Sequence, residues 1–314
     1  FEAGYFLIFD RSADLKKIIV LGATGMLGHA LTHRLEKHFE VWGTLHHAED
    51  NHFFPPSMQD RLVLFDAMSE DRDWQQLWDD VQPDIVINAI GIIKQLSEAK
   101  DPLTAIPINA LFPHRLAKLC AQHSARLIHI STDCVFSGKK GLYTEEDTPD
   151  SQDLYGLSKL MGEVTEPPAL TLRTSIIGHE LKRKKSLLEW FLAQEGEAKG
   201  YTRAIFSGLP VTELARVIET YVIPNPKLTG LYHVSVDPIN KHDLLNLIAR
   251  TYDKKISIQP DETVAIDRSL ISQKFQKATG YTPPKWPQLI EEMYQNYQKH
   301  SAPFQENQLR QAHV

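Results

Sequence analysis

Short apolar runs alternate along the chain with stretches in which apolar residues recur at helical spacing. In the first such stretch Leu27, Leu31 and Leu35 fall on one face of a helix. The predicted strands are 17–21, 41–45, 61–65, 85–88, 126–130 and 171–175, and the predicted helices lie near 74–78, 108–120, 187–194, 212–221, 242–252 and 289–297. Strands that are apolar throughout and alternate with helices predict an α/β fold, with a parallel sheet covered on both faces.

Three glycines follow the first strand at regular spacing. Gly22, Gly25 and Gly28 stand where this strand gives way to the first helix. A side chain at this turn would keep a pyrophosphate away from the helix N-terminus, whose free N–H groups and dipole bind anions. The pattern therefore predicts a dinucleotide site. The residues of the turn expected to contact the cofactor are Gly22, Thr24, Gly25, Met26, Leu27 and Gly28.

The end of the second strand bears on the choice of cofactor. An acid there would hydrogen-bond the 2′-hydroxyl of the adenosine ribose and select NAD. The chain has Thr44-Leu45-His46-His47 at this point, and Glu49 comes only later. We therefore predict NADPH as the cofactor, with NADH as the alternative, and place His46 near the adenosine ribose. The competing interpretation is that both histidines are solvated loop residues.

The regular alternation of apolar strands and helices ends at Glu166-Pro167-Pro168, where two prolines interrupt it. We predict a Rossmann-type, doubly wound NAD(P)-binding domain over residues 15–170. Residues 171–314 are expected to form mainly a smaller substrate-binding α/β part, with segments that return to the Rossmann part. Residues 1–14 are left out of this prediction; they lack a basic n-region, and we do not expect them to act as a signal peptide.

A tyrosine and a lysine stand one helical turn apart at Tyr155 and Lys159. Such a pair suits proton transfer, because the phenol can donate to a carbonyl oxygen as hydride arrives at its carbon. The ammonium lowers the pKa of the phenol and also reaches the ribose of a nicotinamide. We predict that both residues act in catalysis and bind the cofactor, against the alternative that they lie on an ordinary helix surface.

The chain resembles the extended short-chain dehydrogenases, which share its G-x-x-G-x-x-G spacing. This resemblance implies that Thr132, at the end of the fifth strand, hydrogen-bonds the substrate oxygen. It also implies that an Asp after the third strand reaches the adenine, that small residues after the fourth strand let the backbone approach the cofactor, and that an Asn bends a helix. The matching positions are Asp66, Ala67, Asn88, Ala89, Ile90 and Asn109.

Two longer motifs are similar to a narrower family, the dTDP-4-dehydrorhamnose reductases. They run from Ser131 to Gly138 and from Tyr155 to Glu163. The likeness covers about residues 15–180 and implies reduction of a nucleotide-linked 4-keto-6-deoxysugar, in nucleotide-sugar and surface-polysaccharide biosynthesis. It assigns catalysis to Thr132, Tyr155 and Lys159, and it assigns the substrate side to Asp133 and Val135.

The chain departs from that family at two positions on the substrate side. Cys134 replaces a Tyr, and Ile176 replaces a Trp that packs near the sugar in many members. The particular sugar therefore stays open between dTDP-4-dehydrorhamnose and an N-acetylated 6-deoxyhexosulose on UDP. Two further functions fit the same fold. One is an epimerase or dehydratase that keeps NAD bound, although Cys134 stands where dehydratases carry a Glu. The other is a non-catalytic regulatory subunit, although such relatives tend to lose the Tyr or Lys retained here.

Composition narrows the partners and the compartment. Apolar residues make up 42% of the chain and charged residues 24%, and the net charge is −6. No basic face and no apolar run long enough to span a bilayer stand out, so we predict neither nucleic acid nor membrane as a partner. The two cysteines, Cys120 and Cys134, favour a reducing cytoplasm. We expect a monomer or homodimer that binds a nucleotide sugar.

Basic residues after the sixth strand are candidates for contact with a diphosphate. They are the run Lys182-Arg183-Lys184-Lys185 and the single residue Arg203. The alternative is that both belong to solvated loops. His29 and His33 have a spacing that metals use, but no Cys or carboxylate nearby completes a ligand set, so no metal is predicted.

Overall fold

The computed structural model describes residues 15–69, 71–182 and 185–311. Its centre is a parallel seven-stranded sheet in the order β11-β6-β5-β4-β1-β2-β3. The strands of this sheet are β1 (Lys17–Leu21), β2 (Glu40–Leu45), β3 (Leu62–Leu64), β4 (Ile85–Asn88), β5 (Arg126–Thr132), β6 (Leu170–Thr174) and β11 (Gly230–His233). The predicted Rossmann-type parallel sheet is thereby confirmed. Strands β6 and β11 come from the region after the proline break, so this region contributes to the sheet directly.

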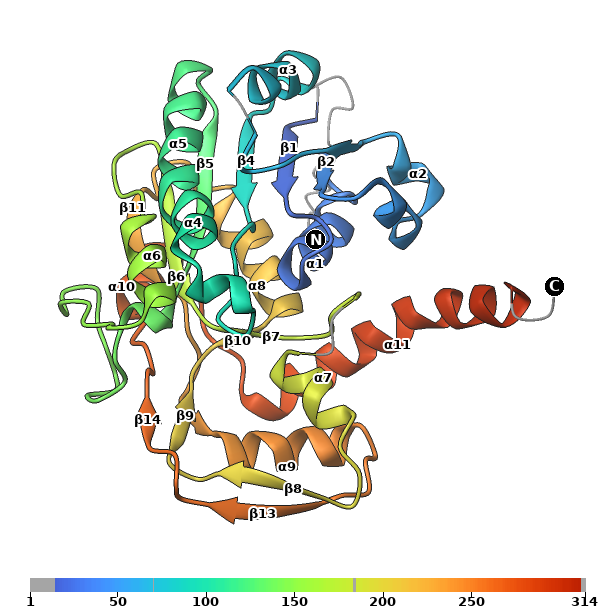
Figure 1. Cartoon of the computed structure of the whole chain (residues 1–314), viewed down its shortest axis with the longest axis vertical. Coiled ribbons are helices and arrows are strands. Elements are labelled where there is room, and N and C mark those ends of the chain that lie inside the picture. Colours follow the sequence, from blue (N-terminus) through green and yellow to red (C-terminus); the bar gives the residue numbers. More distant parts are fainter. Residues whose placement is uncertain (1–14, 70, 183–184, 312–314) are drawn as a thin grey trace, which may run out of the picture.

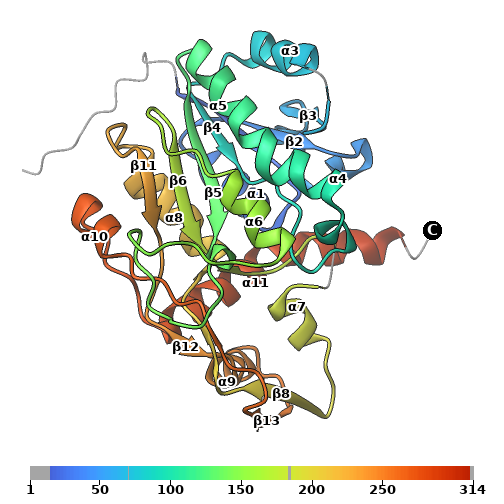
Figure 2. The same ribbon diagram turned by 60° about the vertical axis from the view of Figure 1, so that its left-hand side comes forward.

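Helices cover both faces of the sheet (Figures 1 and 2). One face packs against α3 (Asp71–Val81), α5 (Phe112–Gln122) and α6 (Leu154–Met161), and the other packs against α1 (Met26–Leu35) and α8 (Val211–Val217). The alternation along β1 shows the reason: Ile18 and Val20 point into one apolar core, whereas Ile19 and Leu21 point into the other. Strands buried on both faces must be apolar throughout, as the sequence pattern indicated.

A smaller region lies beyond the carboxyl ends of the sheet strands and contains most of the remaining elements (Figure 1). Its strand pairs are β7 (Ile176–Ile177) with β10 (Leu209–Pro210), and β8 (Glu197–Tyr201) with β13 (Ser257–Asp261). A third small sheet has the order β12 (Ile239–Asn240), β9 (Ala204–Phe206) and β14 (Ile266–Asp267). The longer helices here are α7 (Leu187–Leu192), α9 (Lys241–Thr251) and α11 (Trp286–Gln311), whereas α10 (Gln273–Thr279) lies beside β11 of the main sheet.

Several predicted boundaries move in the structure. The third strand is shorter than predicted, and the fifth extends to Thr132. The helix predicted over 108–120 begins at Phe112, because the preceding turn, Ile106–Leu111, is π-helical and follows the short helix α4 (Pro102–Ala105). Pro107 lacks the N–H of a regular helical bond. The short helices not yet mentioned are η1 (Ala48–Phe53), α2 (Pro56–Gln59), η2 (Ser97–Lys100), η4 (Asp133–Val135) and η5 (Ile218–Val222). None of the helices of the described chain is long and apolar enough to cross a membrane.

Candidate active site

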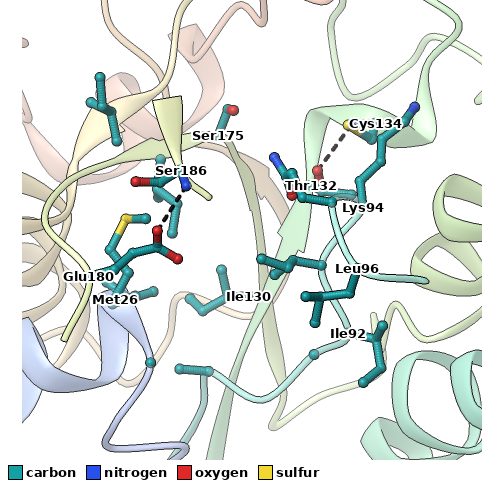
Figure 3. Close-up of a pocket in the computed structure, with 18 of the residues that line it drawn as sticks. Met26, Ile92, Lys94, Leu96, Ile130, Thr132, Cys134, Ser175, Glu180 and Ser186 are labelled. Atoms are coloured by element: carbon teal, nitrogen blue, oxygen red, sulfur yellow. Dashed lines mark hydrogen bonds between the residues drawn. The ribbon is translucent and has the colours of Figure 1, made fainter. Parts of the chain in front are cut away.

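A cavity of about 850 Å³ opens at the carboxyl ends of β1, β4 and β5. This is where open parallel sheets bind their ligands, because the loops that leave neighbouring strands there diverge. Figure 3 shows Met26, Glu180 and Ser186 on one side of the cavity, with Thr132, Cys134 and Lys94 on the other. The wall therefore combines loops of the main sheet with segments of the smaller region.

The glycine turn forms one end of this cavity. Gly22 has a φ of +81°, a conformation that favours glycine, and its N–H donates to Thr44 Oγ1 at 2.9 Å. A Cβ on Gly28 would lie 2.0 Å from the Gly22 carbonyl oxygen, so α1 can approach β1 only with glycine there. The N-terminus of α1 has no side-chain cap and no acid in its first turn. This cradle fits the pyrophosphate of a dinucleotide in size and charge.

Most of the predicted cofactor contacts line the cavity, and the rest support it. The lining residues among them are Gly22, Thr24, Gly25, Met26, Leu27, His46, Ala89, Ile90, Tyr155 and Lys159. Gly28 is buried behind the turn. Asn88 accepts a hydrogen bond from Ile90 N at 3.0 Å, and Asn109 accepts one from Ile92 N at 2.9 Å. The hydrogen bonds of these two side-chain amides therefore hold the loop after β4 in its conformation.

Asp66 and Ala67 lie outside the cavity lining. The Asp66 carboxylate accepts from Met68 N at 2.8 Å in an exposed turn, and Ala67 packs into the core beneath α3. Their contact with an adenine stays a prediction. His46 is exposed at the rim, with its Nδ1 3.0 Å from Nε2 of His47.

Thr132, Tyr155 and Lys159 all line the cavity, although they come from two elements. Thr132 ends β5, and its hydroxyl oxygen accepts from Cys134 N at 3.1 Å. Asp153 caps α6 by accepting from Gly156 N at 2.8 Å, and this cap starts the helix that carries Tyr155 and Lys159. The Lys159 ammonium donates to the Ile130 carbonyl at 2.8 Å, which ties α6 to β5.

Burial shapes the protonation of these groups. It raises the pKa of Tyr155 above its usual value, while a hydrogen bond with Thr132 acts in the opposite direction. Burial also lowers the pKa of Lys159 from 10.5 to about 8, against an opposing effect of the nearby Glu163. Glu163 itself is buried in an ion pair with Arg173 at 2.7 Å and accepts from Ser131 Oγ at 2.6 Å. The site thus holds a protonated phenol beside an amine that titrates near neutral pH.

Two of the three residues predicted for the substrate side are not at the cavity. Asp133 lines it, but the Val135 side chain is fully buried in a small apolar cluster with Phe136, Tyr143 and Leu270, because the η4 turn points it inward. Arg203 is exposed in the bend between β8 and β9, outside the lining. Neither residue lines the cavity, and the contact of Val135 and Arg203 with the substrate stays a prediction.

The structure adds cavity residues that the sequence did not single out. They include Asp50, Lys94, Glu180, Lys241 and Arg268. Lys94 lies in the loop after β4 and pairs with Asp153 at 2.6 Å. Of the predicted basic run, Lys182 lines the cavity and forms an ion pair with the buried Asp50, whereas Arg183 and Lys184 lie outside the described residues. The sequence could have pointed only to Lys94, as a basic residue in the loop after β4. The other four residues come from segments that carry no motif.

Comparison with known proteins places the chain in a family. A family model described as the RmlD substrate binding domain matches residues 16–299. The chain belongs to this family. Within the RmlD family, the chain is 23% identical over 306 residues to the dTDP-4-dehydrorhamnose reductase of Aggregatibacter actinomycetemcomitans, with 88% of this chain and 97% of that protein covered.

Two further similarities agree with that family. A probable low-salt glycan biosynthesis reductase of Haloferax volcanii is 32% identical over 163 residues, which cover 50% of this chain and about half, 52%, of that relative. The crystal structure of a dTDP-4-dehydrorhamnose reductase from Bacillus anthracis, in complex with NADP, superposes with a TM-score of 0.74 at 22% identity. It covers 90% of this chain and 100% of that one, and at this identity it shows the shared fold.

Proposed function

We propose that this RmlD-family chain is an NAD(P)H-dependent reductase of the 4-keto group of a nucleotide-linked 6-deoxysugar, acting in nucleotide-sugar and surface-polysaccharide biosynthesis. The observation that carries the proposal is that Thr132, Tyr155 and Lys159 line the same cavity as the uncapped glycine turn at α1. A reductase needs a proton donor and a cofactor site that open onto one space. The named activities of the relatives support the same assignment.

NADPH, bound at the glycine turn, would supply the hydride chemistry. The protein supplies the proton: the half-buried Tyr155 phenol stays protonated and donates to the oxygen of the keto group. Thr132 donates a hydrogen bond to the same oxygen and thereby positions it. The Lys159 ammonium stabilises the phenolate that Tyr155 becomes. Asp133 and Cys134, which follow Thr132 on the cavity wall, would face the sugar.

We also propose that the protein acts in the cytoplasm, and we keep the predictions of its cofactor and its assembly. The described cysteines, Cys120 and Cys134, are free thiols, which suits a reducing cytoplasm. NADPH rather than NADH stays the predicted cofactor, since the lining residue after β2 is His46 and not an acid. A monomer or homodimer stays the predicted assembly.

A screen of NADPH oxidation tests the function. Purified protein is mixed with dTDP- and UDP-linked 4-keto-6-deoxyhexoses, and loss of NADPH absorbance is followed, with product identified by mass. We expect turnover with at least one substrate and none with Tyr155→Phe. An NAD that co-purifies and never exchanges would instead indicate an epimerase or dehydratase. Binding of NADPH without turnover of any keto sugar would favour a regulatory subunit.

A further inference from the structure

Two basic side chains, Lys241 and Arg268, reach the cavity from the smaller region. Lys241 begins α9, Arg268 follows β14, and both are half-buried on the cavity wall. Arg268 Nε donates to the Phe136 carbonyl at 2.7 Å, which fixes its stem. Among the side chains that the structure describes, neither cation takes part in a salt bridge. By contrast, Lys94 and Lys182 on the same wall are paired with Asp153 and Asp50.

The small sheet β12-β9-β14 brings these two residues together from distant parts of the chain. Asn240 of β12 and Asp267 of β14 both pair with Ile205 of the central strand β9. The residues that follow them, Lys241 and Arg268, therefore leave the sheet on either side of β9. Ile205, which also lines the cavity, lies between them. In Figure 1 this sheet lies below the carboxyl ends of the main sheet, away from the glycine turn between β1 and α1.

The acid that these cations face is Asp133, next to the proposed catalytic Thr132. Burial raises the pKa of Asp133, while Arg268 and Lys241 both act to lower it. Burial lowers the pKa of Lys241, and Asp133 opposes that effect. One half-buried carboxylate therefore lies near two cations. A surplus of positive charge on a cavity wall is an unfavourable arrangement that an anionic ligand would relieve.

We propose that Lys241 and Arg268 bind the diphosphate of the nucleotide-linked sugar and so orient its keto carbon toward Tyr155. The inference rests on the proposed function and deepens it. A guanidinium presents two parallel N–H donors that match phosphate oxygens, and an ammonium adds a compact charge. The pyrophosphate of the cofactor has its own cradle at α1, so the two anions would bind at different parts of the cavity wall. Of the earlier candidates for this role, Arg203 is exposed and Lys182 is already paired with Asp50.

Binding of nucleotides to the full chain tests the proposal. Calorimetric Kd values for dTDP, UDP, dTMP and UMP are measured with the wild type, Lys241→Gln and Arg268→Gln. The control is Lys227→Gln, which removes the same charge from an exposed turn before β11, at the opposite end of the sheet. We expect each cavity variant to raise the Kd for dTDP and UDP roughly ten- to hundred-fold, because losing a hydrogen bond to a charged group weakens binding by about that factor. The control and the Kd for NADPH should be unchanged.

Two further measurements separate a binding role from loss of structure. The conservative variants Lys241→Arg and Arg268→Lys should recover most of the affinity, and unfolding midpoints should stay near that of the wild type. Equal Kd values for diphosphates in wild type and both Gln variants would overturn the subsite, even if keto sugars are reduced. Charge-dependent binding of dTDP or UDP without reduction of any keto sugar would leave the subsite standing and reject the reductase.

Discussion

At the scale of single residues, the proton donor is the group whose removal is most informative. Tyr155 lies at the cavity with its phenol protonated by burial, whereas the cofactor cradle depends on the backbone at Gly22 and α1. Tyr155→Phe should therefore lower kcat by about 10²–10⁴-fold, since it deletes general acid catalysis. The Kd for NADPH, measured by fluorescence titration, should change by less than about threefold. A variant that keeps wild-type kcat would show that another group delivers the proton.

The pKa of Lys159 gives the reaction a predicted pH dependence. Its folded value of about 8 lies below the usual 10.5, so the ammonium is lost as the pH rises through 8. Above that pH, kcat/KM should fall by about tenfold for each pH unit, because this parameter reports groups of the free enzyme. Lys159→Arg keeps the positive charge at high pH, so the fall of kcat/KM above pH 8 should disappear in this variant, whatever its effect on the absolute rate.

The lowered pKa of Lys159 also affects stability. As the pH rises, the stability contribution of this residue should increase, whereas kcat/KM should fall. Between about 8 and 10.5 the unfolded chain binds a proton at Lys159 that the folded chain has released. The contribution of this residue to the free energy of unfolding should therefore increase with pH in that window. Urea titrations of wild type and Lys159→Met at the two ends of the window would measure the difference. A contribution that decreases with pH would contradict the assigned direction.

The predictions for single residues succeeded only in part, for a physical reason. Tyr155 and Lys159 are one helical turn apart, so their spacing predicts a shared site, whereas Thr132 was assigned from the family resemblance; all three line the cavity. Lys241 and Arg268 reach it through pairing between short strands that are far apart in sequence, which no motif records. Val135 lies away from the cavity because the η4 turn, closed by the Thr132 hydroxyl, points its side chain inward.

At the level of the secondary-structure elements, the glycine turn serves both the packing of α1 against β1 and the binding of the cofactor. Two substitutions should separate these two roles. A methyl group on Gly28 would meet the Gly22 carbonyl at 2.0 Å, whereas one on Gly25 would stay 3.2 Å away from it, at the cavity surface. Gly28→Ala should therefore lower the free energy of unfolding by about 2 kcal/mol or more. Gly25→Ala should leave the melting temperature nearly unchanged and weaken NADPH binding. Equal melting temperatures for the two variants would contradict this account.

The sequence predicted the elements of the main sheet better than those of the smaller region. Strands buried on both faces carry an unmistakable apolar signal, and the predicted parallel order with covering helices is confirmed. Strands β8 and β13 pair with each other but keep several residues exposed, so their sequences lack that signal. The helix predicted over 242–252 is confirmed as α9, and Asn240 caps it by accepting from Asp243 N at 2.8 Å.

At the scale of the whole molecule, the boundary predicted after residue 170 does not coincide with a gap in the core. One apolar core contains Leu31 of α1, Ile128 of β5 and Leu214 of α8, and β5 pairs with β6 beyond the break. A fragment of residues 15–170 would expose that face of α1 and leave β5 as an open edge. We expect this fragment to lack a cooperative thermal transition and to aggregate, whereas the full chain should unfold in one calorimetric step. A fragment that melts cooperatively and binds NADPH would support an independent domain.

The amide of Asn109 links the loop after β4 to α6. From the π-helical turn before α5, it donates to Ile92 O at 3.2 Å and to Ser158 Oγ at 3.3 Å. Ile92 belongs to the cavity lip after β4, and Ser158 precedes Lys159 on α6. A ligand that pushes the lip outward therefore pulls on the helix that carries the proton donor. We therefore expect the buried Asn109 side chain to transmit movement of the lip, as the substrate enters, to the helix that holds the acid.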